Sequence, residues 1–366
     1  MDVPRDGTHD LSVFANSLNT YNLVREHGPT NVFLRADGAA EQELFLPLGY
    51  KWVVWDHTDT RVSLSAGRHT ISLAAKSLDG AKATTGDAIV DRITLSLPNP
   101  AAATAHYPAS RAELTLSAPA AGGVSLRRGG TATFWVHSRS DAESTLDAGI
   151  RSGAASVTVN GIAVPARAAV SLSGGLNKVV VKAKINGTIL DRLTVRPSAH
   201  LEPTVLEAES AARTGSATVV PKSLAGGGAA VSGVGNGPAN TLTFTVPAAR
   251  AGTYALRIRY SNPEQAEATH YNPDPLARHA DISVNGGAAR RVLFPHSFHD
   301  NNFWELTVPV TLRRGANEVT FSSAEPPNFD GTTYASQTWP GVLLRSAYAP
   351  VLDRVTVTPY AKALHR

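Results

Sequence analysis

The sequence predicts an all-β fold of three tandem antiparallel β-sandwich domains. An Asp-Arg heptad of alternating apolar residues recurs at residues 89–95, 189–195 and 351–357, with spacings of 100 and 162 residues. Period-two alternation, as in residues 242–246, is typical of half-buried strands, and no stretch has the 3.6-residue period of a long helix. The repeat is too long for a solenoid, so it indicates copies of one domain.

Two further motifs accompany each heptad in the same order. A Gly-Thr strand opening begins at Gly7, Gly130 and Gly252, and a Leu-x-x-Gly turn motif with His or Asn two residues after the glycine spans residues 64–71, 172–179 and 312–319. From the turn glycine to the heptad aspartate the three counts are 24, 16 and 38 residues. Growth of one loop on a constant scaffold is how binding sites diversify, so the third copy is expected to carry the most elaborate site.

These motifs divide the chain into three predicted domains, at residues 1–97, 98–200 and 201–366. Proline-rich breaks at residues 98–100 and 197–200 mark the expected linkers. Gly7 follows only six residues, whereas Gly252 lies 45 residues after Glu207. The first copy is therefore expected to lack its N-terminal strands. Met1 is then not a natural domain boundary, or another segment supplies these strands.

Composition excludes several classes of protein. The absence of cysteine excludes disulfides, iron–sulfur clusters and thiolate zinc sites. No run of 18 apolar residues occurs, and the start of the chain has no signal-peptide pattern, so a membrane partner is not expected. The net charge of +4 comes largely from scattered arginines without aromatic interleaving, which argues against nucleic acid as a partner.

The third copy resembles a known family through four sequence features. These are Val205-Leu206-Glu207-Ala208-Glu209, the glycines at 226–228, Ser283-Val284-Asn285-Gly286, and the heptad from Val351. In order and spacing, residues 202–359 resemble the β-sandwich carbohydrate-binding modules of families 6 and 35, whose fold is a galactose-binding-like jelly roll. The first copy resembles the second part of this module, and the second copy resembles it more weakly.

The resemblance implies a non-catalytic function in binding a polysaccharide or oligosaccharide. Such modules are accessory parts of bacterial polysaccharide-degrading enzymes, so the expected partner is an upstream catalytic domain of a secreted glycoside hydrolase or polysaccharide lyase. Two alternatives remain open at this point. The sandwiches are purely structural spacers, or the third domain itself cleaves glycans.

The paired glutamates of the third copy suggest a cation site. Glu207 and Glu209 lie two residues apart on a predicted strand, so both carboxylates would point to one face and repel each other. Carboxylate oxygens suit calcium. The resemblance implies that Glu207, Glu209 and Asp353 bind structural calcium. Asp91 and Asp191 lack paired glutamates, and a turn-capping role is expected for them.

Sugar binding requires aromatic faces together with amides and charges. Two loop-like stretches that the second copy lacks contain such residues, and the resemblance places the ligand among loops at one end of the sandwich. In the first copy, Trp52 and Trp55 would lie on opposite faces of an extended segment. The candidate ligand-binding residues are Asn262, His270, Tyr271, Trp304, Asn328, Asp330, Tyr334, Trp339, Asn16 and Trp52.

A catalytic interpretation of the third copy rests on a dense set of polar residues. Their histidine spacings match no metal motif, and no nucleophile or phosphate-loop motif occurs, so loop or core positions are expected for the histidines. The set comprises His270, His279, His296, His299, Asp274, Asp300 and Glu305.

Overall fold

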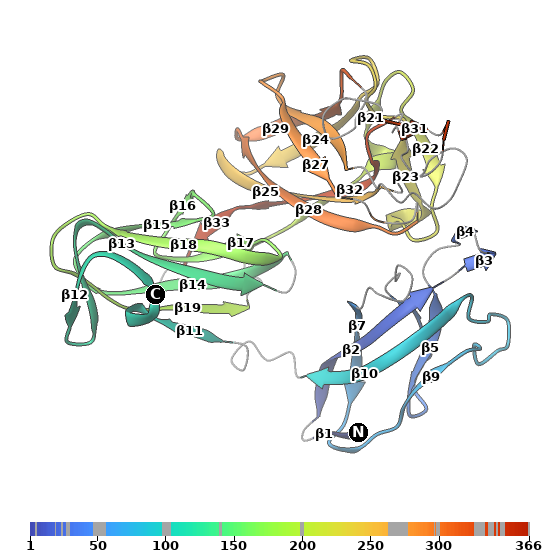
Figure 1. Cartoon of the computed structure of the whole chain (residues 1–366), viewed down its shortest axis with the longest axis horizontal. Helices are drawn as coiled ribbons and strands as arrows, with labels where there is room; N and C mark the ends of the chain where they lie inside the picture. The colour runs from blue at the N-terminus through green and yellow to red at the C-terminus, as the bar shows by residue number, and fades with distance from the viewer. Residues whose placement is uncertain are drawn as a thin grey trace.

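The computed structural model confirms the predicted all-β fold, and its described residues form antiparallel strands and three short 3-10 turns (Figure 1). Within the described ranges, no helix combines the length and the hydropathy that crossing a membrane requires. The structure describes residues 1–3, 6–18, 20–22, 25–26, 30–46, 56–96, 104–138, 141–197, 201–262, 277–295, 297, 301–325, 334–335, 340–341, 343–344 and 348–364. Buried hydrophobic residues form three clusters, which we assign to the N-terminal (1–96), middle (104–197) and C-terminal (201–359) segments.

The C-terminal segment is a two-layer sandwich. Its first sheet has the order β22-β23-β32-β25-β28, with β20 also paired to β32, and its second sheet has the order β21-β24-β29-β26-β27. These strands are β20 (Thr204–Glu207), β21 (Ala212–Arg213), β22 (Thr218–Pro221), β23 (Ala229–Ser232), β24 (Leu242–Ala248), β25 (Gly252–Ser261), β26 (Arg278–Val284), β27 (Arg290–Phe294), β28 (Trp304–Leu312), β29 (Gly315–Ser322) and β32 (Val351–Pro359).

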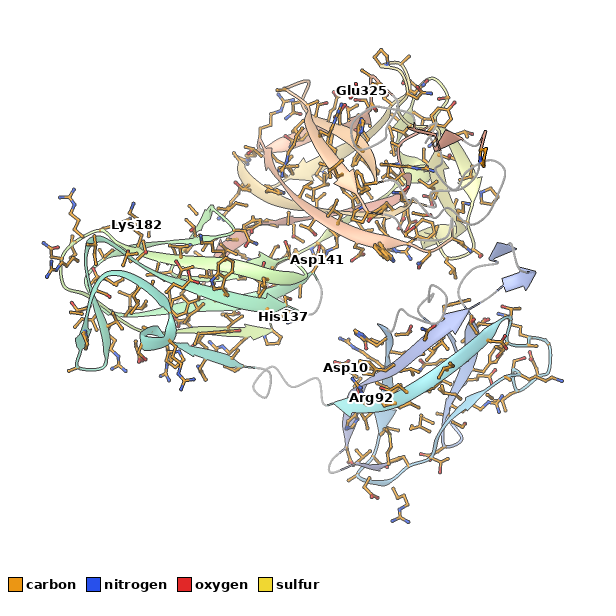
Figure 2. All side chains as sticks on the ribbon, viewed as in Figure 1. Asp10, Arg92, His137, Asp141, Lys182 and Glu325 are labelled. Atoms are coloured by element: carbon orange, nitrogen blue, oxygen red, sulfur yellow. The ribbon has the colours of Figure 1, made fainter. Side chains whose placement is uncertain are left out.

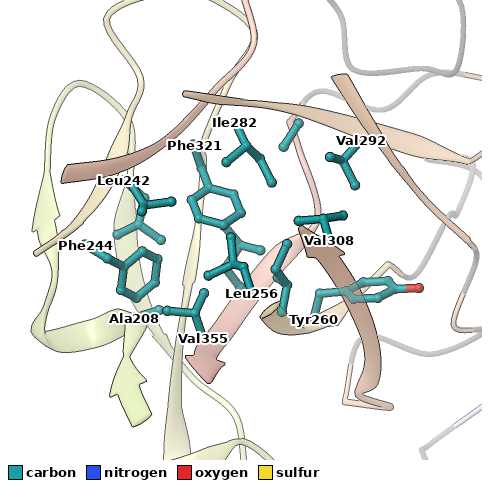
Figure 3. Close-up of a cluster of buried hydrophobic side chains, with 14 of the residues drawn as sticks. Ala208, Leu242, Phe244, Leu256, Tyr260, Ile282, Val292, Val308, Phe321 and Val355 are labelled. Atoms are coloured by element: carbon teal, nitrogen blue, oxygen red, sulfur yellow. The ribbon is translucent and has the colours of Figure 1, made fainter. Parts of the chain in front are cut away.

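Alternation along these strands builds the core of the C-terminal segment. Leu256 and Tyr260 of β25 point inward from the first sheet, and Phe244 and Phe321 point inward from the second, packed edge to face at 5.7 Å between ring centroids. Figure 3 shows these side chains gathered between the strands. The polar positions between them face outward, as period-two patterning requires.

The middle segment closes around one long strand, β13 (Gly123–Ser138). Residues 131–138 pair with β18, whereas residues 124–126 pair with β19, so β13 runs through both layers of the sandwich. The other strands are β11 (Ala105–Pro108), β12 (Glu113–Ala120), β14 (Ala142–Ser152), β15 (Ala155–Val159), β16 (Ile162–Val164), β17 (Arg167–Leu172), β18 (Gly175–Ala183) and β19 (Thr188–Pro197).

The described residues of the N-terminal segment form two three-stranded sheets, of order β10-β2-β7 and β6-β5-β9, around their own cluster of buried residues, and β1 pairs with β8 and β3 with β4. Its strands are β1 (Asp2–Val3), β2 (Gly7–Leu18), β3 (Thr20–Asn22), β4 (Arg25–Glu26), β5 (Asn31–Ala36), β6 (Gln42–Phe45), β7 (Asp56–Leu64), β8 (Gly67–Arg68), β9 (Ile71–Ala74) and β10 (Asp87–Ser96). The short strands β30 (Tyr334–Ala335) and β31 (Leu343–Leu344) pair with each other in the C-terminal part of the chain.

The heptad strands differ in how many neighbours they have. In the C-terminal segment β32 pairs with β20 as well as β25, and in the middle segment β19 pairs with β11, in both cases up to the heptad arginine. Within the described residues β10 pairs with β2 alone. Ile89 and Val90 of β10 are accordingly 49% and 42% exposed. Within the described residues β10 thus has one unpaired edge, and the lack of N-terminal strands in the first copy stays a prediction.

The final strand, β33 (Ala361–Ala363), does not continue the C-terminal sandwich. It pairs antiparallel with β17 of the middle segment, where Ala363 is opposite Ala168. The sequence-based range 201–366 placed these residues in the third domain, so the strand assignment at this end differs from the prediction. Because alternation over three residues is too short a signal, nothing in the sequence distinguished this strand from a tail.

The predicted turn motif has the same geometry in all three segments. Gly67, Gly175 and Gly315 adopt φ of 128°, 90° and 99°, a conformation that favours glycine. Two residues later in the C-terminal segment, buried Asn317 donates to the carbonyls of Arg313 and Gly315 and accepts from the side-chain amide of Asn285.

The middle segment repeats this network with Asn177 and Asn160, joined at 2.9 Å. In the N-terminal segment the equivalent pair is His69 and Asp37, with 2.5 Å between His69 Nδ1 and Asp37 Oδ2. Asp37, Asn160 and Asn285 share a φ of 51° to 52°. An ionisable pair thus replaces the amide pair of the other two segments.

The stability of the N-terminal segment is expected to depend on pH through this pair. The hydrogen bond to Asp37 raises the pKa of His69 above 6.5, and the Thr70 amide followed by His69 lowers the pKa of Asp37 below 3.8. The contribution of His69 is fully present below its unfolded pKa and is lost as the pH rises through its folded pKa. The contribution of Asp37 is lost as the pH falls through its own folded pKa.

Hydrogen exchange of the β9 amides from pH 3 to pH 9 measures this dependence. The double variant Asp37→Asn, His69→Asn recreates the amide pair of the other segments and should flatten the profile. An unchanged profile in the double variant would show that other groups control it.

Candidate functional site

The three predicted calcium ligands lie at one end of the first sheet of the C-terminal segment. Glu207 ends β20, and Asp353 lies in β32 beside the register shift between Arg259 and Tyr260 of β25. Glu209 is not on the strand, as the sequence prediction had it, but in the 3-10 turn η2 (Ala208–Ser210). The chain turns because Ala208 packs into the core, where it is fully buried.

Asp353 is fully buried and is held by two charge-assisted contacts. The Gly226 amide donates to its Oδ1 at 2.8 Å, and Arg259 forms an ion pair with its Oδ2. Arg259 also donates to the Leu224 carbonyl at 3.0 Å, so it ties β25 to the glycine-rich loop. Burying a carboxylate requires such compensation.

The heptad aspartates of the other two segments have different surroundings. Asp91 pairs with the neighbouring Arg92 at 2.9 Å, and Asp191 pairs with Arg151 at 2.8 Å. Both carboxylates retain solvent exposure, so neither has the buried environment of Asp353.

Glu207 and Glu209 each keep one buried oxygen without a hydrogen-bond partner. These atoms are Glu207 Oε2 and Glu209 Oε2. Burial, followed by repulsion from Asp353, raises the pKa of Glu207. Two acidic side chains with unsatisfied buried oxygens indicate a place where a cation is favourable.

The glycine-rich loop closes over these carboxylates. A Cβ at Gly226 would lie 2.9 Å from Glu207 Oε2, and one at Gly227, whose φ is 64°, would lie 2.7 Å from Glu209 Oε1. Side chains at these positions would push the carboxylates out of place. Gly226 and Gly227 are thus explained by close approach of the backbone to the acidic pair.

The donor chemistry at this place fits calcium, which takes six to eight oxygen ligands from carboxylates, carbonyls and water. Glu207 and Glu209 provide oxygens that the protein does not satisfy. Asp353 is bound by Arg259, and no group of three or more His, Asp or Glu side chains in the described part of the chain is arranged to hold a metal. The two glutamates are therefore the better-placed ligands.

Aromatic side chains adjoin the acidic group through Arg259. The Arg259 guanidinium lies 4.8 Å from the centroid of the Phe303 ring, a cation–π distance. The next residue, Trp304, begins β28 opposite Tyr260 and is 38% exposed. Trp304 therefore lies at the same end of the sheet as Arg259. Sequence reasoning missed Arg259 and Phe303 because an arginine on a strand is usually a solvated side chain.

Two of the three candidate asparagines, Asn262 and Asn16, are among the described residues, and both are buried. Asn262 follows β25, and its Nδ2 donates to the Phe294 carbonyl at 2.9 Å, while its Oδ1 is buried without a partner. Asn16, in β2 opposite Ile89, has neither amide atom hydrogen-bonded. Each brings an unsatisfied polar atom to the end of its strand, and their ligand roles stay predictions.

Most of the other predicted ligand residues cannot be placed. Of Tyr334 the structure describes the backbone, which lies in β30. The residues outside the described ranges are His270, Tyr271, Asn328, Asp330, Trp339 and Trp52.

Two members of the catalytic set have structural roles. His279 is fully buried in β26, with Nε2 2.9 Å from Ser323 Oγ, so it occupies the core position expected for a histidine. Glu305 lies 3.9 Å from Arg257 on the sheet surface. The other members, His270, His296, His299, Asp274 and Asp300, lie outside the described residues.

Two clefts border the C-terminal segment away from the acidic group. One, of about 330 Å³, opens between β27 and β28 and is lined largely by aliphatic side chains such as Val292 and Val308. The other, of about 280 Å³, lies between the middle and C-terminal segments beside Asp141 and Arg257 (Figure 2 labels Asp141). Neither is lined by a predicted ligand residue.

Comparisons with known proteins give matches among solved structures. No family model matches the chain, and no curated protein matches it. A family 35 carbohydrate-binding module from Clostridium thermocellum is 25% identical over 42% of this chain and 98% of its own, with a TM-score of 0.34. A CBM35 from Cellvibrio japonicus is 18% identical over 45% of this chain and 99% of its own, with a TM-score of 0.31. The solved structures that the chain resembles over part of its length thus include family 35 carbohydrate-binding modules.

Proposed function

We propose that this chain binds carbohydrate without cleaving it, as the accessory region of a secreted glycoside hydrolase or polysaccharide lyase. The observation that carries the proposal is the exposed indole of Trp304 at the start of β28, next in sequence to Phe303, whose ring lies against Arg259. An exposed indole offers a flat apolar face, which suits the apolar side of a sugar ring.

The proposal includes structural calcium at Glu207 and Glu209. A cation there would neutralise the two carboxylates and hold η2 against the loop at 226–228. Through Gly226, Asp353 and Arg259, that loop connects to Phe303. Calcium would thereby hold the sugar-binding end in shape without contacting the sugar.

The proposal also includes three sandwich domains, at residues 1–97, 98–200 and 201–366. The last strand of the third range, β33, adds to a sheet of the second domain. A structural function is a second candidate. The pairing of β33 with β17 and the contact of Thr307 with Asp141 join the middle and C-terminal segments. A spacer would use the same contacts and would bind no glycan.

A glycan array probed with the full chain tests the binding function. We expect selective retention on one class of polysaccharide, and we expect Trp304→Ala to reduce it at least tenfold, since truncating an aromatic hot spot of a binding site typically costs about 2 kcal/mol or more, which exceeds a tenfold loss of affinity. Val219→Ala, at an exposed apolar position of the same segment, is the control. No retention on any glycan would favour the spacer.

A further inference from the structure

The outer face of the middle sandwich carries an exposed tryptophan that its core does not need. Trp135 of β13 is 46% exposed, while its neighbours Phe134 and Val136 point inward and are buried. Leu176, on the adjacent β18, is 66% exposed. Leu176 is diagonal to Trp135 on the same face, and adjacent exposed apolar side chains, unlike single scattered ones, are typical of a binding surface. We call the surface around Trp135, Glu113, Lys178 and Lys182 the Trp135 face.

The indole of Trp135 is held in a fixed orientation. Its Nε1 donates to Glu113 Oε1 of β12 at 2.9 Å, and Lys178 Nζ lies 5.6 Å from the ring centroid. Trp135 and Lys178 are direct cross-strand partners. A ring that is already positioned loses little conformational entropy when a ligand stacks on it. The face is thus preorganised, although the sequence marked the second copy as the degenerate one.

The charge of the Trp135 face is positive. Lys178 and Lys182 are both exposed on β18, on the same side as Trp135, and residues four apart on a strand are separated by ~13 Å. Among the described outward positions of β12, β13 and β18, Glu113 supplies the carboxylate, and the indole already engages it. A ligand on this face therefore meets two cations that are spread along the strand.

We propose that the Trp135 face binds an acidic polysaccharide. One pyranose ring stacks on Trp135, and carboxylates of the neighbouring sugars pair with Lys178 and Lys182. Figure 2 labels Lys182 on β18 and His137 at the far end of β13, which mark the two ends of the surface. This site lies in the middle segment and is separate from the proposed site at Trp304.

Titration of the full chain with polygalacturonate, and with neutral galactan as the uncharged control, tests this inference. We expect polygalacturonate to bind in low salt and to weaken as sodium chloride is raised, because exposed ion pairs are screened. Trp135→Ala should weaken binding at least tenfold, Trp135→Phe by less, and Lys178→Gln with Lys182→Gln should remove the salt dependence. Unfolding temperatures would show that each variant is folded.

The variants separate this inference from the proposed function. Loss of binding in Trp135→Ala together with retention in Trp304→Ala supports the Trp135 face. Three outcomes would overturn it: no binding of polygalacturonate, equal dependence of galactan binding on Trp135, or loss in Trp304→Ala alone. The last of these would leave the proposed function of the C-terminal segment standing.

Discussion

Replacing Tyr360 with alanine is expected to lower the free energy of unfolding of the middle segment by about 3–5 kcal/mol, as for other large aromatic deletions in cores. Tyr360 follows the C-terminal sandwich in sequence, yet it packs in the core of the middle segment and is 4% exposed. Its carbonyl accepts from the Ser171 amide at 3.0 Å, and its amide donates to the Thr253 carbonyl at 2.9 Å. Tyr360 therefore contacts both the middle and the C-terminal segments and connects them.

Truncation after Pro359 should destabilise the middle segment further, because it also removes β33 and leaves the edge of β17 unpaired. Tyr360→Phe is the matched control. The Tyr360 hydroxyl makes a long contact of 3.4 Å with the Val159 carbonyl, so removing this hydroxyl should lower the free energy of unfolding by about 1 kcal/mol or less. Differential scanning calorimetry of the full chain measures both. If Tyr360→Ala and Tyr360→Phe have the same unfolding temperature, the aromatic ring of Tyr360 does not stabilise the middle segment.

Adding calcium chloride should stabilise the C-terminal segment, by about 2.7 kcal/mol when the ion is present at a hundredfold excess over its dissociation constant. The reason is that a cation satisfies the buried oxygens of Glu207 and Glu209 and removes their mutual repulsion. The double variant Glu207→Gln, Glu209→Gln keeps the shape and removes the charge. It should lose the calcium response, yet remain at least as stable as the unchanged chain in chelator.

Glu305→Gln serves as the matched control for this experiment, since Glu305 is a partly exposed glutamate on the same sandwich. It should respond to calcium like the unchanged chain. Thermal unfolding in calcium and in EDTA provides the measurement. An identical unfolding temperature in both solutions would contradict calcium binding at Glu207 and Glu209. A full rise in unfolding temperature with calcium in the double glutamine variant would contradict it as well.

The repeated motifs predicted the scaffold well because they are local. Each heptad lies within a strand, β10, β19 or β32, and each turn glycine has a positive φ, since a tight turn requires that conformation whatever surrounds it. Alternation likewise identified residues 242–246 as a half-buried strand, which is β24. These features depend on a few neighbouring residues, and sequence patterns report such features directly.

The features that sequence reasoning missed all depend on distant contacts. The pairing of β33 with β17 joins residues about 190 positions apart, and the ion pair of Arg259 with Asp353 spans 94 positions. The burial of Ala208 in the core draws Glu209 from the strand into a turn. In the turn motif the sequence shows His69 where the other two copies have asparagine. Its partner Asp37 lies in another turn, so the ion pair itself was not predicted.

Calorimetric titration of the full chain with the polysaccharide that the array selects, with reducing ends measured in the same sample, tests the central claim most directly. The account predicts a saturable heat, a loss of most of that heat in Trp304→Ala, and no increase in reducing ends. Absence of heat with every selected glycan would contradict carbohydrate binding. A steady rise in reducing ends would show instead that the chain is an enzyme.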